Sequence, residues 1–202
     1  MLNLKRRTNV TANKPKDIII LNGPPGSGKD ALCKVICEHT RTKHLEVKAR
    51  LFDLALSISG LTAPVWWGLY NDREKKERPT PLLGGLSPRG FMIHISEQVM
   101  KPLFGADYFG RYAAAQAESC PSDVIIFTDG GFREEVKLLA EVGNVHLVHL
   151  YREGYTFEGD SRSYLSPDEP FLSTFLRIDQ VEGDLDYAAQ ALVSHMMEWW
   201  SK

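Results

Sequence analysis

The sequence predicts an α/β protein built on a doubly wound parallel sheet. Three short segments rich in bulky apolar residues, at 18–21, 123–129 and 145–151, are typical of strands that are buried on both faces of such a sheet. The first two are each followed by a glycine-rich turn and then by a helical pattern. Strands that alternate with helices in this way favour a parallel sheet covered by helices on both faces.

The turn after the first apolar run is rich in glycine and ends in a lysine. Gly23, Gly26, Gly28 and Lys29 fit the G-x-x-x-x-G-K spacing of a phosphate-binding loop, and an amphipathic helical pattern follows. Glycines let the backbone turn its N–H groups toward a phosphate, and the lysine places a cation between the β- and γ-phosphates. We therefore expect these four residues, together with Ser27, to bind ATP.

The residue after the lysine is unusual for a phosphate-binding loop. Most such loops carry Ser or Thr there, whose hydroxyl holds Mg²⁺, whereas this chain carries Asp30. A carboxylate can also ligate Mg²⁺, directly or through water. A second acid, Asp129, ends the second apolar run and would lie at the same carboxyl edge of the sheet as Lys29. We therefore predict ATP and Mg²⁺ as cofactors, with Asp30 and Asp129 at the metal.

Length and charge restrict the classes of partner. The 202 residues suit a flexible tail at 1–15 and a single domain at 16–202. Charged residues make up 25% of the chain and the net charge is -2, which predicts neither nucleic acid nor membrane as a partner. No apolar run approaches 18 residues, so we expect a cytoplasmic protein with a small-molecule partner. A homodimer is left open.

Further elements follow from local patterns. Residues 45–56 suggest a strand that ends near Ala49 and a helix beyond it. Ser87 is a candidate helix cap because Pro88 stands at the first helical position. The remaining expected elements are helices at 107–117, 133–142 and 185–199 and a short strand at 175–178.

Two segments do not follow any regular pattern. Residues 61–90 contain four prolines and a cluster of charges, which indicates a functional loop or a lid-like insertion, or else a solvated surface loop. Residues 152–170 are polar and turn-rich, and we predict a second lid-like segment there. The aromatic residues of the first segment fit either stacking on a bound base or a small hydrophobic cluster: Trp66, Trp67 and Tyr70.

Several segments together resemble the deoxynucleoside monophosphate kinases of bacteriophages. The loop ending in Gly28-Lys29-Asp30 is similar to that family's loop, which also favours Asp after the lysine. Residues 73–89, REKKERPTPLLGGLSPR, resemble its charged segment, its prolines and its T/S-P-R helix start. Residues 105–109, GADYF, resemble its G-x-D-x-W/F segment. The interrupted matches extend from about residue 17 to residue 183.

The chain departs from this family in two places. The family's D-x-R-F-x-x-E reads DGGFREE at 129–135, so Gly131 stands where the arginine is expected, and Arg133 is a candidate to serve instead. The family's D-x-H-x-S-E resembles the segment at 160–163, with Arg162 where histidine is usual. These differences bear on which base and sugar such a kinase would accept.

The resemblance implies a P-loop fold of the nucleoside monophosphate kinase type. It also implies transfer of the γ-phosphoryl group of ATP to a (deoxy)nucleoside 5′-monophosphate. The second pKa of a phosphate monoester is about 6, so the attacking oxygen is already ionised and catalysis reduces to positioning and charge neutralisation. We expect the inserted region at 61–90 to bind the acceptor, with Arg89 holding its phosphate. Lys29, Arg89, Arg152 and Asp129 form the predicted catalytic set, and Arg162 is a further predicted ligand of ATP.

Two alternatives stay open on the sequence alone. A P-loop kinase of another small phosphorylated or alcohol acceptor would share the loop, and an alcohol acceptor would need a general base such as Asp129 or Asp53. A non-catalytic module that uses ATP as a switch would agree with the missing Ser/Thr after Lys29 and the missing arginine at Gly131.

Overall fold

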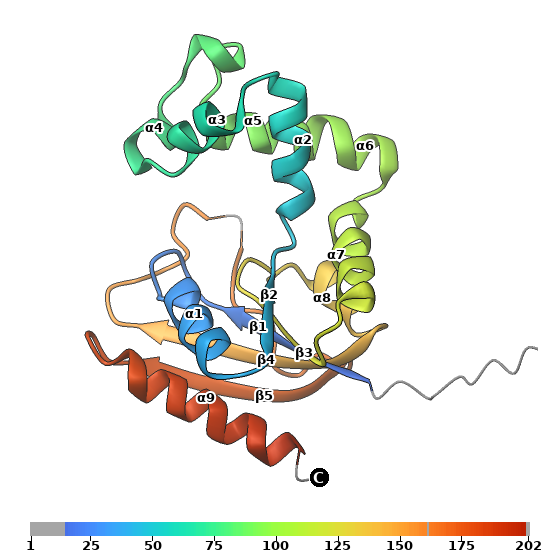
Figure 1. Ribbon diagram of the computed structural model, residues 1–202, viewed down its shortest axis with the longest axis vertical. Helices are drawn as coiled ribbons and strands as arrows, with labels where there is room; N and C mark the ends of the chain where they lie inside the picture. Colours follow the sequence, from blue (N-terminus) through green and yellow to red (C-terminus); the bar gives the residue numbers. More distant parts are fainter. Residues whose placement is uncertain (1–14, 161, 201–202) are drawn as a thin grey trace, which may run out of the picture.

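The structure, a computed structural model, describes residues 15–160 and 162–200, so the predicted tail at 1–15 lies outside it except for Pro15. Its centre is a parallel sheet with the strand order β2-β3-β1-β4-β5 (Figure 1). The predicted α/β class is thereby confirmed. The strands are β1 (Lys16–Asn22), β2 (Thr42–Leu45), β3 (Val124–Phe127), β4 (Gly143–Arg152) and β5 (Leu172–Gln180).

The helices fall into two groups. One group packs on the sheet and the other, α2 to α6, gathers beyond the end of β2 as a layer that we call the helical cap, residues 49–104 (Figure 1). The helices are α1 (Lys29–His39), α2 (Ala49–Ser59), α3 (Ala63–Tyr70), α4 (Arg73–Glu77), α5 (Pro88–His94), α6 (Lys101–Phe104), α7 (Tyr108–Ser119), α8 (Arg133–Leu139) and α9 (Leu185–Trp200), with a 3₁₀ turn η1 (Pro81–Leu83) and a π-helical segment η2 (Ile95–Met100). None of the helices in the described ranges is long and apolar enough to cross a membrane.

The apolar run of β1 explains why both faces of the sheet are covered. Side chains alternate between the two faces of a strand. Ile18 and Ile20 enter the core under α7 and α8, whereas Ile19 and Leu21 enter the core under α1 and α9. All four side chains are fully buried. Because the strands are parallel, their carboxyl ends lie along one edge, and the helical cap stands beyond that edge (Figure 1).

The structure corrects the expected strand after the first helix. We placed it from Leu45 to near Ala49, but β2 spans Thr42–Leu45 and a turn leads directly into α2. The carboxylate of Asp129 accepts hydrogen bonds from the backbone N–H groups of Val47 and Lys48, which holds these residues in the turn. The helix that we expected beyond Ala49 is present, and the last strand is longer than the predicted 175–178.

The irregular segment at 61–90 is largely helical. It forms α3, α4, η1 and the start of α5. Pro64, Pro81 and Pro88 stand at the first turns of these elements, where the missing N–H of proline is not needed. The predicted cap is confirmed, since Ser87 Oγ accepts a hydrogen bond from the Gly90 N–H at 3.0 Å.

Candidate active site

The predicted phosphate-binding loop joins β1 to α1. Gly26 and Gly28 have φ angles of 81° and 86°, in the left-handed region that residues with a Cβ atom rarely adopt. A Cβ atom at Gly23 would lie 2.7 Å from the carbonyl oxygen of Leu150, so glycine lets the loop pack on β4. Ser27 is fully buried, and its Oγ has no hydrogen-bond partner within the described residues. The loop thus presents backbone N–H groups and the start of α1 to a ligand.

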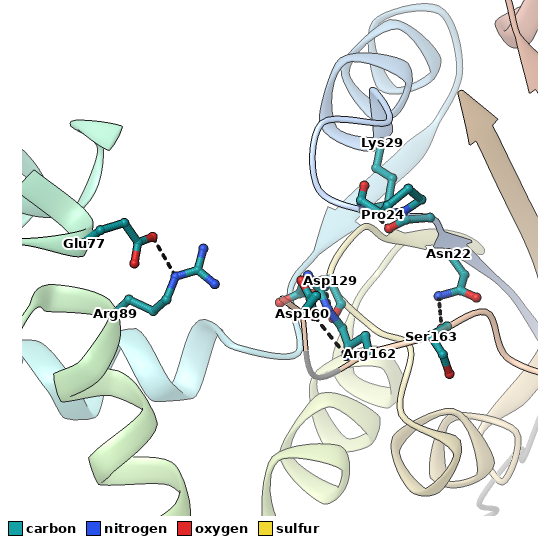
Figure 2. Close-up of polar contacts among 10 residues, drawn as sticks. Asn22, Pro24, Lys29, Glu77, Arg89, Asp129, Asp160, Arg162 and Ser163 are labelled. Atoms are coloured by element: carbon teal, nitrogen blue, oxygen red, sulfur yellow. Dashed lines mark hydrogen bonds and ion pairs between the residues drawn. The ribbon is translucent and has the colours of Figure 1, made fainter. Parts of the chain in front are cut away.

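Lys29, at the start of α1, folds back over the loop. Its Nζ donates hydrogen bonds to the carbonyl oxygens of Gly23 at 2.6 Å and Pro24 at 2.7 Å (Figure 2). Burial, reinforced by the nearby Arg162 cation, lowers the pKa of Lys29 to about 8. Anionic phosphate oxygens would be stronger acceptors for this ammonium group than the two carbonyl groups.

Arg162 lies beside the loop as well. Its Nε and Nη2 donate hydrogen bonds to the two carboxylate oxygens of Asp160 at 3.0 and 2.9 Å, and its Nη1 lies 3.5 Å from the carbonyl oxygen of Asp129 (Figure 2). The Asp160 carboxylate therefore fixes the direction of this guanidinium group. Lys29, Asp129 and Arg162, three of the predicted site residues, come together at the carboxyl edge of the sheet.

Gly131, at the position where the sequence lacked an expected arginine, lies beside an arginine from another segment. A Cβ atom at Gly131 would lie 3.7 Å from Arg162 Cδ, so Arg162 adjoins this position from a different segment of the chain. Arg133, the substitute suggested by the sequence, instead pairs with Glu169 at 2.7 Å and has a half-exposed side chain.

Asp129 is bound to the backbone on both of its carboxylate oxygens. Oδ1 accepts from Val47 and Oδ2 from Lys48, each at 2.9 Å. Each oxygen keeps a second lone pair, and Asp30 is exposed at the loop. Among the described residues, no three His, Cys, Asp or Glu side chains are grouped to hold a metal ion. Mg²⁺ takes most of its ligands from waters and phosphates, so this donor set is compatible with it, and the metal role of both residues stays a prediction.

A cavity of about 710 Å³, which we call the loop cavity, separates the phosphate-binding loop from the helical cap. Gly26 and Asp30 line it on the loop side. Most side chains that line it on the cap side are aromatic or cationic, among them Trp67, Tyr70, Lys76 and Arg89, and the polar Asn71 and the acidic Glu77 line it as well.

A second cavity of about 290 Å³, the cap cavity, adjoins the first. The two share Lys48, Tyr70, Lys76 and Arg89 as lining residues, so they are adjacent, and we refer to them together as the cleft. The cap cavity extends from these shared residues to side chains of α5, η2, α7 and α8, among them Met92, Glu97, Phe109 and Glu135.

Arg89 reaches this cleft from the wall opposite the loop. It is the second residue of α5, and its Nε pairs with Glu77 Oε1 at 2.8 Å. In Figure 2 this pair faces the group of Asp129, Asp160 and Arg162 across an open space, which the two cavities define. The side chain of Arg89 is 46% exposed, so it is accessible to a ligand.

Arg152 is placed differently from the other predicted residues. It ends β4, donates to the carbonyl oxygen of Gly26 at 3.2 Å and to Glu182 at 3.1 Å, and lies over the ring of Tyr155. It lines a separate hollow of about 190 Å³ beside Gly28, not the loop cavity or the cap cavity. Arg152 therefore contacts the loop from outside the cleft.

Sequence reasoning missed two residues that shape the site, Asn22 and Lys48, and it matched Glu135 as the last residue of the DGGFREE motif without giving it a role. Asn22 donates to the carbonyl oxygen of Ser163 at 3.3 Å and accepts from the N–H of Leu165 at 2.8 Å, which ties the predicted lid segment to the end of β1 (Figure 2). The signal for Asn22 was a polar residue that closes an apolar run. Lys48 had no such signal because the preceding strand was misplaced.

The aromatic residues of the cap divide into two roles. Trp66 is fully buried in the core, so stacking on a ligand is excluded for it. Trp67 is 38% exposed and lines the loop cavity, and Tyr70 lines both cavities.

No protein-family model matches this chain, and no curated protein matches it. Solved structures with a similar fold include shikimate kinase from Acinetobacter baumannii, with 14% identity, a TM-score of 0.44 and coverage of 92% of this chain and 94% of that chain. A gluconokinase from Sinorhizobium meliloti has 14% identity, a TM-score of 0.42 and coverage of 93% and 98%. A sugar kinase from Janibacter sp. has 16% identity, a TM-score of 0.42 and coverage of 88% and 94%. The activity therefore has to be argued from the residues of this chain.

Proposed function

We propose that this protein transfers the γ-phosphoryl group of ATP to a (deoxy)nucleoside 5′-monophosphate and yields ADP and the corresponding diphosphate. One observation carries the proposal: the cavity beside the phosphate-binding loop adjoins a second cavity, and the cations Lys48, Lys76 and Arg89 line both. A triphosphate on the loop and a monophosphate at these cations would face each other in a single cleft. Two polyanions that must meet in line need such cations between them.

The loop side of the cleft suits the donor. Gly26, Gly28 and the start of α1 would surround the phosphates of ATP, and Lys29 would exchange two loop carbonyls for phosphate oxygens. Arg162, held by Asp160, offers a second cation at the same edge. Bound ATP and Mg²⁺ supply the phosphoryl group and a divalent charge that neutralises it. Asp30 and Asp129 are the proposed carboxylates for that ion.

The cap side of the cleft suits an anionic acceptor. Glu77 engages Nε of Arg89 and leaves both Nη groups for a bidentate grip on a phosphate. Lys76 lies on the same wall and adds a second cation. We assign Arg89 to the acceptor phosphate and Lys29 to the donor phosphates. Arg152 acts from the outer side of the loop by holding the carbonyl of Gly26.

The two carboxylates that the sequence suggested as a general base do not favour an alcohol acceptor. A general base must lie within hydrogen-bond reach of the proton that it removes. Asp129 already accepts a backbone hydrogen bond on each oxygen, and Asp53 is exposed on α2 and lines neither cavity. A phosphate monoester is ionised at neutral pH and requires no base.

The test is ADP release from ATP and Mg²⁺ with each common ribo- and deoxynucleoside monophosphate offered separately. We expect turnover with one or a few of them and none with the unphosphorylated nucleosides. No ADP release with any monophosphate, with ATP binding intact by calorimetry, would overturn the proposal and leave another acceptor or a non-catalytic ATP switch.

A further inference from the structure

The inner part of the cap cavity is lined by a carboxyl group that has one unpaired oxygen. Glu135, on α8, lines this cavity, and its Oε2 is buried without a hydrogen-bond partner within the described residues. Burial, reinforced by the charge of Asp129, raises the pKa of Glu135 to about 7. Buried polar atoms in folded proteins are nearly always paired, so an unpaired one on a side chain that lines a cavity calls for an explanation, and a ligand in that cavity is one.

The other carboxylates of the same cavity differ from Glu135. Glu97 accepts from Lys101 at 2.6 Å and from Ser96 at 2.9 Å. Asp160 is bound by Arg162, and Asp129 by two backbone N–H groups. Glu135 is also held at the start of α8, by a hydrogen bond from the backbone of Phe132, but its Oε2 is buried and unpaired, which is true of none of these three.

The surroundings of Glu135 define the shape of the missing partner. Met92, Phe109 and Phe132 contribute apolar side chains to the same cavity, and the cations Lys76 and Arg89 line both this cavity and the adjacent loop cavity. A volume of about 290 Å³ is at the lower end of the range for small-ligand sites. A nucleotide with its flat polar base between these walls would place its phosphate at the cations and the N–H groups of the base toward the carboxylate.

We propose that Glu135 accepts hydrogen bonds from the base of the acceptor nucleotide and thereby sets the base preference of the site. This inference rests on the proposed nucleoside monophosphate kinase function. A carboxylate has two acceptor oxygens and matches an edge with two adjacent N–H donors. Among the common bases, guanine presents that edge through its ring N1–H and its amino group. Thymine and uracil present one N–H between two carbonyls, which a carboxylate repels.

The test compares Glu135→Gln with Glu134→Gln in the full chain. Glu134 is the preceding residue on α8 and is exposed, so it controls for the change in charge. Equilibrium binding of each monophosphate is measured by calorimetry without ATP, and kcat and KM are measured with ATP. We expect wild-type protein to bind guanine monophosphates most tightly. In Glu135→Gln, which turns one acceptor into a donor, the Kd for guanine monophosphates rises roughly 30-fold.

The specific prediction is that this loss of affinity is confined to monophosphates whose base contacts Glu135. In Glu135→Gln the KM for ATP and the Kd for thymidine monophosphate change less than about threefold, and Glu134→Gln resembles the wild type. An equal loss for every monophosphate, or an unchanged guanine preference, would overturn the inference while leaving the kinase function in place. A wild-type protein that neither binds nor phosphorylates any monophosphate would overturn both.

If Glu135→Gln does not fold, Glu135→Asp carries the same test. It keeps the carboxylate but withdraws it by one methylene group. We expect guanine monophosphates to lose affinity selectively, and a preserved preference in this variant contradicts the proposed role.

Discussion

The two sides of the cleft are built in different ways. On the loop side, three polar side chains are fixed by the backbone: Lys29 holds two loop carbonyls, Asp129 two N–H groups, and Asn22 one of each. On the cap side, Arg89 is fixed by Glu77 in an exposed ion pair, which is a weak restraint. The comparison teaches that the proposed donor half is held in place by the fold itself, whereas the proposed acceptor half leaves its arginine only weakly restrained.

The largest effect is expected for Lys29→Ala. It removes the cation that we assign to the donor phosphates, so kcat falls roughly 10³-fold in the ADP-release assay. Lys34→Ala is the matched control, because Lys34 is on the same helix with an exposed side chain. Activity near the wild-type level in Lys29→Ala would contradict the assignment of Lys29 to the donor phosphates on the loop side.

A second test compares two aspartates that each accept two backbone hydrogen bonds. Asp129→Ala leaves the partly buried N–H groups of Val47 and Lys48 without an acceptor, so we expect a loss of about 3 kcal/mol in unfolding free energy. Asp72→Ala removes the equivalent contacts from exposed N–H groups of α4, which water can replace. Denaturant unfolding of both variants measures the two losses of unfolding free energy. Equal losses would contradict the view that the contacts of Asp129 fix the loop side more firmly than an exposed cap fixes α4.

A third test uses the carboxyl group of Glu135. Its folded-state pKa of about 7 is above its ordinary value of 4.5, so the folded protein holds this proton more tightly than the unfolded chain does. The free energy of unfolding therefore falls as pH rises from about 5 to 8. We expect Glu135→Gln to lack this loss. Between pH 5 and pH 8, the unfolding free energy of the wild type should therefore fall by about 2 kcal/mol more than that of the variant.

Denaturant unfolding at the two pH values measures this difference. Glu134→Gln, which changes an exposed carboxylate, is the control and should follow the wild type. A Glu135→Gln curve parallel to that of the wild type would show that burial of Glu135 costs the fold nothing.

The smallest effect is expected for Arg89→Ala. Because the guanidinium is half exposed, its loss raises the KM for the monophosphate about tenfold and leaves the KM for ATP unchanged. Arg78→Ala is the control, since Arg78 is exposed at the end of α4 and lines neither cavity. A loss confined to ATP would mean that Arg89 belongs to the donor half.

The features that could be predicted from the sequence are those set by neighbouring residues. The apolar run and glycine spacing of β1 and its loop depend on neighbouring residues, so this part was predicted from the sequence. The start of α2 depends on Asp129, 82 residues away from Val47, and the preceding strand was misplaced. Short helices such as α3 are stabilised mainly by tertiary packing, here between Trp66, Tyr70 and Phe52, and give little periodic signal. The unpaired oxygen of Glu135 is visible only in three dimensions.

The adjacent tryptophans of α3 give the protein a built-in optical probe. Trp66 is enclosed by the core, while Trp67 is tilted against Phe52 at 5.1 Å and borders the loop cavity. Indole emission shifts toward the blue when water beside the ring is displaced, so filling the cavity will change the Trp67 signal and spare that of Trp66. Ligand binding can then be followed by fluorescence without a label, and a Trp67→Phe variant identifies the component that responds.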